Sequence, residues 1–256
     1  MNITRTLLSI GVVGLLAVSA NADFTQVTDS GSEATVREIF DHYFGVATSG
    51  PMTGTLDAAH EWYTFDTGGG ATRVNDFGAG YSSPIDLLTP NLSTDNDMIW
   101  TDGIATFEVQ ARFAGYDQSF GIDTDLTNSV VDHNEVFSVT GSGYTDTGLS
   151  GGASGLHLSG EWAWTRAGSD AGPWSSNAPD NTDSLDHVVT YLLDPADGKT
   201  NETVWWVFFE DLNNLGDHDY NDLAVEIRAQ PIPVPGAAIL GLVGLGMVGA
   251  VRGRFS

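Results

Sequence analysis

The sequence contains no cysteine and few basic residues, and each lack excludes a class of function. Without cysteine, the 256-residue chain can form no disulfide, zinc ribbon, thiolate nucleophile or cysteine-ligated iron–sulfur cluster. Lys and Arg number 9 against 34 Asp and Glu, which gives a formal net charge of −25 at pH 7. Such a surface repels nucleic-acid phosphates and anionic membrane surfaces, so we expect no nucleic-acid partner.

Glutamate is also scarce, since the acidic residues comprise 25 Asp and 9 Glu. Helical surfaces usually favour Glu, whereas Asp competes with the helix backbone and favours turns. Together with 31 glycines, this bias predicts strands joined by loops, and it suits a hard cation held by oxygen ligands. The hydrophobic fraction of 41% is sufficient for a packed core.

Residues 1–22 have the pattern of a secretory signal peptide. Arg5 provides the positive charge, and residues 7–18 form an apolar run. Ala20 and Ala22 then give the small-x-small pattern for cleavage before Asp23. The sequence therefore predicts export.

The C-terminal residues 231–256 form a second targeting segment. A Pro-rich stretch at 231–236 predicts an extended spacer, followed by an uncharged apolar run of 15 residues at 237–251. We expect a short hydrophobic helix there, below the roughly 20 residues that span a bilayer comfortably. Membrane contact is expected only through the terminal segments, with the final arginines on the cytoplasmic side.

This tail resembles the PEP-CTERM sorting signal of exported Gram-negative bacterial proteins. The carrying residues are Pro233 and Pro235, which enclose Val where the family has Glu, and Arg252 and Arg254, which Gly253 separates. The resemblance implies a transient inner-membrane anchor, delivery to the cell surface or extracellular matrix, and processing by an exosortase, a membrane-embedded protease.

Residues 23–230 are predicted to form one acidic domain, with six basic and all 34 acidic residues and a balance of −28. An amphipathic helix is expected from an N-cap at Ser32 to a termination at Gly45. Its apolar face has helical spacing and comprises Val36, Ile39, Phe40, Tyr43 and Phe44. We expect this face to cover an edge or end of a sheet.

The remaining part of the domain favours strands. Alternating or continuous apolar patterns predict them at 105–113, 136–140, 156–164, 187–193, 203–209 and 223–227. The segments 187–193 and 203–209 are apolar on both faces, which predicts central strands joined by a hairpin at Asp197-Gly198. Asp102-Gly103 predicts a turn, and residues 165–186 predict a long polar loop. The expected fold is mainly β, an antiparallel sandwich or jelly roll with one helix.

An acidic loop between the last two predicted strands carries the candidate metal site. Asp217, Asp219 and Asn221 lie at alternate positions, as ligands do in calcium loops. Asp211 and Asp222 add carboxylates at the two ends of the loop. These five residues predict a Ca²⁺ site. The alternative is a solvated turn whose side chains bond their own backbone.

The same loop is similar to the signature of the bacterial family named domain of unknown function 4114. The carrying motif reads Glu-Asp-Leu, a glycine, then Asp-x-Asp-Tyr-Asn-Asp-Leu, within residues 210–223. Shorter likenesses at 113–121 and 186–191 extend the resemblance over residues 100–228. It implies a β-rich, calcium-binding surface domain and supplies no reaction.

The sequence thus predicts an exported, non-catalytic protein with a structural or adhesive role and a calcium-stabilised β domain. The alternative is a calcium-dependent carbohydrate-binding module for exopolysaccharide, in which Trp174 of the predicted polar loop stacks on a sugar. A secreted hydrolase ranks third, because 34 acidic residues produce carboxylate pairs by chance.

Overall fold

The computed structural model describes residue 27 and residues 33–45, 47–49, 62–65, 68–74, 83–92, 95–168, 172–195 and 202–230. The described residues contain one α-helix, α1 (Val36–Phe44), and the 3₁₀ turns η2 (Thr145–Thr147), η3 (Ala178–Asp180) and η4 (Asn213–Leu215). The strands are β1 (Ala47–Ser49), β2 (Trp62–Phe65), β3 (Gly69–Arg73), β4 (Ser83–Asp86), β5 (Asp95–Arg112), β6 (Gln118–Asp123), β7 (Asn134–Val139), β8 (Gly143–Tyr144), β9 (Gly152–Gly168), β10 (Trp174–Ser175), β11 (Val188–Pro195), β12 (Thr203–Phe209) and β13 (Leu223–Gln230). The predicted mainly β fold with one helix is confirmed.

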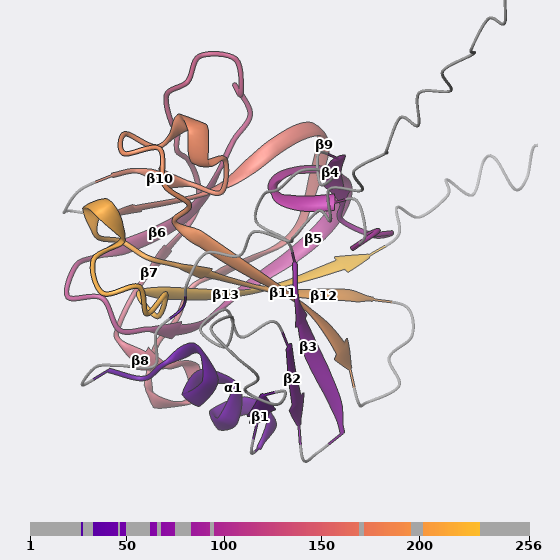
Figure 1. Ribbon diagram of the computed structural model, residues 1–256, viewed down its shortest axis with the longest axis vertical. Coiled ribbons are helices and arrows are strands. Elements are labelled where there is room, and N and C mark those ends of the chain that lie inside the picture. Colours follow the sequence, from indigo (N-terminus) through magenta and orange to yellow (C-terminus); the bar gives the residue numbers. More distant parts are fainter. Residues whose placement is uncertain are drawn as a thin grey trace, which may run out of the picture.

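The strands follow one continuous antiparallel path, in the order β1-β2-β3-β11-β12-β13-β5-β9-β6-β7. Strand β4 adds to β5 in parallel, whereas β8 and β10 pair with β5 and β9 in antiparallel fashion. The long strand β9 pairs with β5 through residues 152–162 and with β6 through residues 163–168. This change of partner leads the chain from the main sheet into a second layer, which lies on the opposite side of β11, β12 and β13 from α1 (Figure 1).

Strand β12 is central, as its two apolar faces predict. It pairs with β11 on one side and β13 on the other. Trp205, Val207 and Phe209 belong to the buried cluster shared with β6 and β9, whereas Trp206 and Phe208 belong to the cluster beneath α1. Successive residues of a strand point to opposite faces, so burial of both sets requires a layer on each side.

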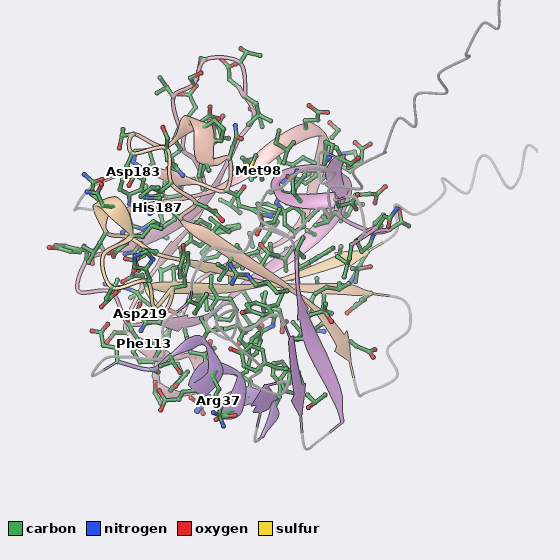
Figure 2. The ribbon with its side chains drawn as sticks, in the orientation of Figure 1. Arg37, Met98, Phe113, Asp183, His187 and Asp219 are labelled. Carbon is green, nitrogen blue, oxygen red and sulfur yellow. The ribbon has the colours of Figure 1, made fainter. Side chains whose placement is uncertain are left out.

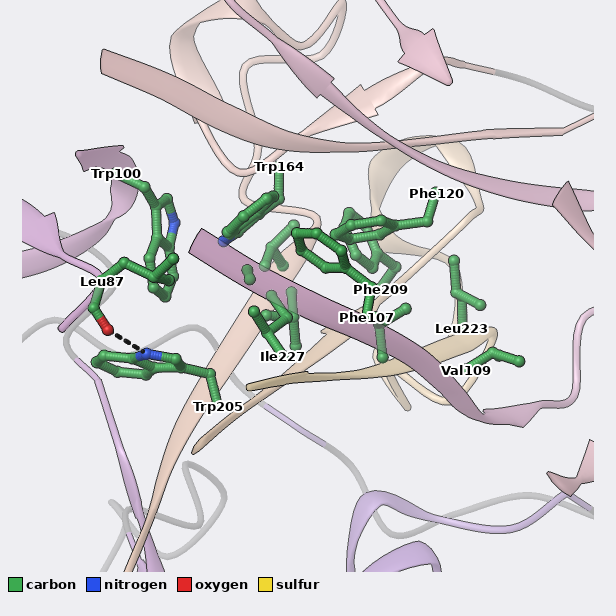
Figure 3. Close-up of a cluster of buried hydrophobic side chains, with 14 of the residues drawn as sticks. Leu87, Trp100, Phe107, Val109, Phe120, Trp164, Trp205, Phe209, Leu223 and Ile227 are labelled. Carbon is green, nitrogen blue, oxygen red and sulfur yellow. Dashed lines mark hydrogen bonds between the residues drawn. The ribbon is translucent and has the colours of Figure 1, made fainter. Parts of the chain in front are cut away.

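The first cluster holds the two layers of strands together. Figure 3 shows Trp164 and Phe120 facing Phe107 and Phe209 of the main sheet. The ring centroids of Phe107 and Trp164 are 5.7 Å apart, and those of Phe107 and Phe120 are 5.5 Å apart. Trp205 in this cluster also forms a hydrogen bond, in which its indole N–H donates to the carbonyl oxygen of Leu87 at 3.0 Å.

Helix α1 covers the other face through Phe40, which is fully buried. The Phe40 ring lies 5.3 Å from those of Trp206 and Phe208, measured between centroids. The helix ends at Gly45 as predicted, but its N-cap is Thr35 and not Ser32. Thr35 and Glu38 form a reciprocal capping box, which satisfies two free N–H groups and fixes the start of the helix there.

The turn predicted at Asp102-Gly103 is wrong, because β5 continues through both residues. The pairing of β5 with β9 slips between Thr101 and Gly103, which marks a β-bulge. Asp102 has a φ of 35°, and its carboxylate accepts a hydrogen bond from the N–H of Gly160 at 3.1 Å. Asp and Gly tolerate the unusual backbone conformations that both a turn and a bulge require, so composition alone does not separate the two.

The long polar loop predicted at 165–186 is wrong in its first part. Strand β9 extends to Gly168, and the short strand β10 pairs back with it through Trp174 and Ser175. The antiparallel pairing of β11 with β12 agrees with the predicted hairpin, whose Asp197-Gly198 tip lies outside the described residues. The signal peptide (1–22) and the sorting tail (231–256) also lie outside them. Within the described residues, no helix has the length and apolar character needed to cross a bilayer.

Candidate metal centre

The acidic loop joins the ends of two paired strands. Phe209, the last residue of β12, pairs directly with Leu223, the first residue of β13. The next residues outward, Glu210 and Asp222, are therefore brought to the same end of the ladder. The turn η4 lies between them along the chain and carries the loop outward.

Three carboxylates converge at this end of the ladder. One oxygen from each of Glu210, Asp219 and Asp222 lies within 4.8 Å of the other two. All three residues are buried, with exposed fractions of 0%, 4% and 8%. An all-oxygen donor set is the kind that Ca²⁺ and Mg²⁺ prefer, whereas softer metals favour His and Cys.

Burial and mutual repulsion make these carboxylates hard to ionise together. Burial, followed by the nearby Asp211 and Glu210 carboxylates, raises the pKa of Asp222 to about 9. Burial raises the pKa of Glu210 to about 8, with a further contribution from Asp219. Burial and the neighbouring Asp217 raise the pKa of Asp219 to about 6. A divalent cation between the three oxygens would remove this penalty by compensating their charge.

The hydrogen bonds around the cluster leave acceptors free. The N–H of Asp211 donates to Asp222 at 2.7 Å, and the N–H of Leu212 donates to Glu210 Oε1 at 3.1 Å. The other Glu210 oxygen, Oε2, is buried and has no hydrogen-bond partner among the described residues, and the same holds for Asn221 Oδ1. Buried oxygen atoms without partners are costly, and each offers a lone pair to a cation.

Contacts from outside the loop hold it in place. The Tyr220 hydroxyl donates to the carbonyl of Asp186 at 2.7 Å. The His187 ring bonds the Glu210 carbonyl through Nδ1 and the Asp183 carboxylate through Nε2. Asp183 also accepts from the N–H of Asn214 at 2.8 Å. Figure 2 shows Asp183, His187 and Asp219 on the same side of the molecule, where these contacts connect the loop to the start of β11.

The structure separates the five residues predicted as metal ligands. Asp219 and Asp222 belong to the cluster, and Asn221 lies beside it, donating from Nδ2 to Asp219 at 2.8 Å. Asp217 is exposed and is not part of the cluster, although its charge raises the pKa of Asp219. Asp211 is buried in an ion pair with Arg166, at 3.0 Å between Oδ2 and Nη2, and lies outside the cluster.

Sequence reasoning missed Glu210 as a candidate ligand. The sequence contains a usable signal, because Glu210 and Asp222 directly flank two predicted strands that follow one another in the chain. Flanking residues of an antiparallel pair meet at the end of the ladder. The spacing of residues within the loop predicts the ligands less well, because the loop backbone lacks the regular alternation of side chains that this spacing assumes. Asn214, His218 and Tyr220 all have positive φ values, of 58°, 63° and 54°.

Trp174 does not occupy the exposed position that sugar stacking requires. It is 1% exposed, and its indole N–H donates to the carbonyl of Asp211 at 2.7 Å. The ring stacks on His187, with centroids 3.8 Å apart and planes inclined by 3°. Trp174 therefore supports the acidic loop from behind, and the hypothesis that it stacks on a sugar is wrong. Trp162 and Trp164 are also core residues, as expected from their shared strand face.

No protein-family model matches the chain, and no curated protein matches it either. Among solved structures, the C-terminal domain of BC2L-C lectin from Burkholderia cenocepacia is similar, with 17% identity and a TM-score of 0.32. The match covers 54% of this chain and 97% of that one. This likeness is too distant to carry an argument about function.

Proposed function

We propose that this protein is a non-catalytic, exported β domain that binds Ca²⁺ through Glu210, Asp219 and Asp222. The observation that carries the proposal is the convergence of three buried carboxylates, with free acceptors at Glu210 Oε2 and Asn221 Oδ1. Ca²⁺ takes six to eight oxygen ligands in irregular geometry, which backbone carbonyls and water complete. Mg²⁺ demands a stricter octahedron, so an irregular loop favours the larger ion.

A bound ion would join the two strands that the loop connects. Glu210 follows β12 and Asp222 precedes β13, so one cation in contact with both would fasten the end of the ladder. An exported domain without cysteine has no disulfide with which to do this. We assign the ion a structural role, and the protein a structural or adhesive role at the cell surface.

The first test is thermal unfolding of the full-length chain in EDTA and in CaCl₂ at pH 7.5. A free ligand at 100 times its Kd stabilises the folded state by about 2.7 kcal/mol. For a domain of this size, that corresponds to an increase in Tm of about 5–11 °C. Parallel melts in MgCl₂ identify the ion, because we expect a much smaller effect from Mg²⁺.

Two matched substitutions locate the site. Asp222→Asn removes a carboxylate from the cluster and is expected to abolish most of the calcium-dependent increase in Tm. Asp217→Asn makes the same chemical change at an exposed position of the same loop, and should leave the increase nearly intact. An absence of any Tm increase with Ca²⁺ would refute the metal site. An equal loss in both variants would place the ion elsewhere in the loop.

We also propose export and surface delivery, on the strength of residues 1–22 and the sorting tail at 231–256. Expression of the chain in a Gram-negative host with an exosortase, followed by fractionation and mass spectrometry, tests this. A product that begins at Asp23 and lacks the tail is expected. Replacing Pro233, Pro235, Arg252 and Arg254 with Ala should leave the tail uncleaved, and a product processed like the original would refute the assignment.

A further inference from the structure

Asp211, which the sequence predicts as a metal ligand and the structure places outside the carboxylate cluster, joins the acidic loop to the second layer of strands. Its Oδ2 accepts a hydrogen bond from Gln118 Nε2 at 2.7 Å and lies 3.0 Å from Nη2 of Arg166. Its backbone carbonyl accepts from the indole N–H of Trp174 at 2.7 Å. Three side chains, from β6, β9 and β10, therefore hold one residue of the loop.

These three side chains belong to one packed unit. Strand β9 pairs with both β6 and β10, and Arg166 is the direct cross-strand partner of Phe120 and of Trp174. Gln118, Arg166 and Trp174 are all buried. Closely packed interior side chains have little room to shift, so they fix the position of Asp211 relative to the second layer as well as to its own loop.

The peptide group that precedes Asp211 in the chain contacts the proposed metal ligands. Its N–H, which belongs to Asp211, donates to Asp222 Oδ2 at 2.7 Å. Its carbonyl, which belongs to Glu210, lies 2.9 Å from His187 Nδ1. A peptide group is planar, so contacts at both of its ends fix its orientation. The orientation of the Asp222 carboxylate and the starting direction of the Glu210 side chain therefore both depend on where Asp211 is held.

Asp211 itself is poorly placed to bind the ion. Its carboxylate is not a member of the cluster of Glu210, Asp219 and Asp222. It lies against the Arg166 guanidinium, and that positive charge would repel a divalent cation bound to the same carboxylate. Residues that orient metal ligands without touching the metal are common in metal sites, and their loss typically lowers metal affinity about 10- to 100-fold.

We propose that Asp211 is a positioning residue of the calcium site, and that through it the ion fastens the second layer of strands to the acidic loop. This inference rests on the calcium site proposed above. The ligands by themselves join only β12 to β13, whereas the contacts of Asp211 extend the effect to β6, β9 and β10. Coupling is reciprocal, so contacts that raise the calcium affinity are themselves stabilised by calcium to the same extent.

The first test is isothermal titration of the full-length chain with CaCl₂, at a temperature at which near-UV circular dichroism shows each variant folded. Asp211→Asn is expected to raise the Kd about 10- to 100-fold, although it alters no ligand. Gln118→Leu and Trp174→Phe each remove one hydrogen bond to Asp211, and each is expected to raise the Kd about 3- to 10-fold. Gln110→Leu is the matched control for Gln118→Leu and should leave the Kd unchanged. It alters a buried glutamine of β5 whose side chain forms no hydrogen bond within the described residues.

The second test is hydrogen exchange in EDTA and in saturating CaCl₂, a readout that a merely structural role of Asp211 would not change. Calcium should slow amide exchange in β6 and β10 of the wild-type protein, and Asp211→Asn should lose this protection. An unchanged Kd in folded Asp211→Asn and Gln118→Leu, or equal protection of β6 and β10 in Asp211→Asn, overturns the proposal and leaves the calcium site standing. Gln118→Leu is the milder change and decides the question if Asp211→Asn does not fold. Absence of calcium binding to the wild-type protein refutes the calcium site itself, and this inference with it.

Discussion

Asp219→Asn is expected to stabilise the metal-free protein at neutral pH, although it alters a buried residue of the candidate site. In the absence of a cation, the Asp219 carboxylate lies close to those of Glu210 and Asp222. Burial and the charge of Asp217 raise its pKa to about 6 from an ordinary value of 3.8. Asn has nearly the same shape and carries no charge, so the substitution removes the cost of ionisation.

The magnitude follows from the pKa difference. Ionising a group with a folded pKa of about 6 and an unfolded value of 3.8 costs the folded state about 3 kcal/mol at pH 8. Asp219 accepts hydrogen bonds from the backbone N–H and the side-chain amide of Asn221, and an Asn at 219 can accept only one of them. Losing the other costs about 1 kcal/mol. The net gain is about 2 kcal/mol, or about 4–8 °C in Tm.

The pH dependence has a definite sign. Because the folded pKa is raised, the folded state binds this proton more tightly, and the wild-type protein loses stability as pH rises from about 3.8 through about 6. Below pH 3.8 the carboxyl is protonated in both states, so Asp219→Asn keeps only the cost of the lost hydrogen bond. The variant should therefore melt slightly lower than wild type at pH 3.5 and higher at pH 8, in EDTA.

Calcium should reverse the order at pH 8. The wild-type protein gains about 2.7 kcal/mol at 100 times its Kd, whereas Asp219→Asn has lost a ligand and is expected to gain less than the roughly 0.7 kcal/mol that would preserve its lead of about 2 kcal/mol. The assay is a set of calorimetric melts of both proteins, in EDTA and in CaCl₂. A lower Tm for Asp219→Asn in EDTA at pH 8 would refute the argument that burial and nearby charge make the ionised Asp219 carboxylate destabilising. An equal calcium gain in both proteins would refute the role of Asp219 as a ligand.

Three further predictions concern the supports of the fold, each measured by urea unfolding in EDTA. Trp174→Ala should cost about 3–5 kcal/mol, since it removes a buried ring and an indole hydrogen bond; a cost below 1 kcal/mol would show that the ring does not support the loop. Arg166→Met should cost about 3–5 kcal/mol by removing the charged partner of the buried Asp211 carboxylate, against less than about 0.5 kcal/mol for Arg37→Met at a half-exposed i,i+4 pair. Equal effects of the two arginine substitutions would contradict this. Thr35→Ala should cost about 1 kcal/mol by removing the N-cap of α1, and no change would show that water replaces the cap.

Much of the architecture could be predicted because apolar periodicity reports directly on burial. The alternating clusters of β12 require a layer on each face, and the structure supplies β6 and β9 on one face and α1 on the other. The buried positions Val36, Ile39 and Phe40 of α1 follow the predicted helical spacing. These patterns are local. Any arrangement of elements that covers both faces of the strand is stabilised by burial of the same apolar side chains.

The positions that could not be predicted depend on competition between similar local options. Ser32 and Thr35 can both cap a helix, and the reciprocal bonds with Glu38 favour Thr35. Asp102-Gly103 suits a turn or a bulge, and the pairing of β5 with β9 decides for the bulge. In each case the two local options differ in free energy by only about 1 kcal/mol, which residue propensities do not resolve. A contact formed in the folded structure decides between them.

The sequence by itself predicted a mainly β, highly acidic domain between two segments that have the patterns of targeting signals, and it placed five of the 34 acidic residues in the last loop between strands. The tertiary structure decided what each acidic residue does. It paired Asp211 with Arg166 from β9, left Asp217 in solvent, and brought Glu210 to Asp222 across the end of the ladder. It also buried Trp174 behind that loop. These outcomes depend on contacts between residues far apart in the chain, since a carboxylate's charge and pKa depend on what surrounds it, and its sequence neighbours are only part of that environment.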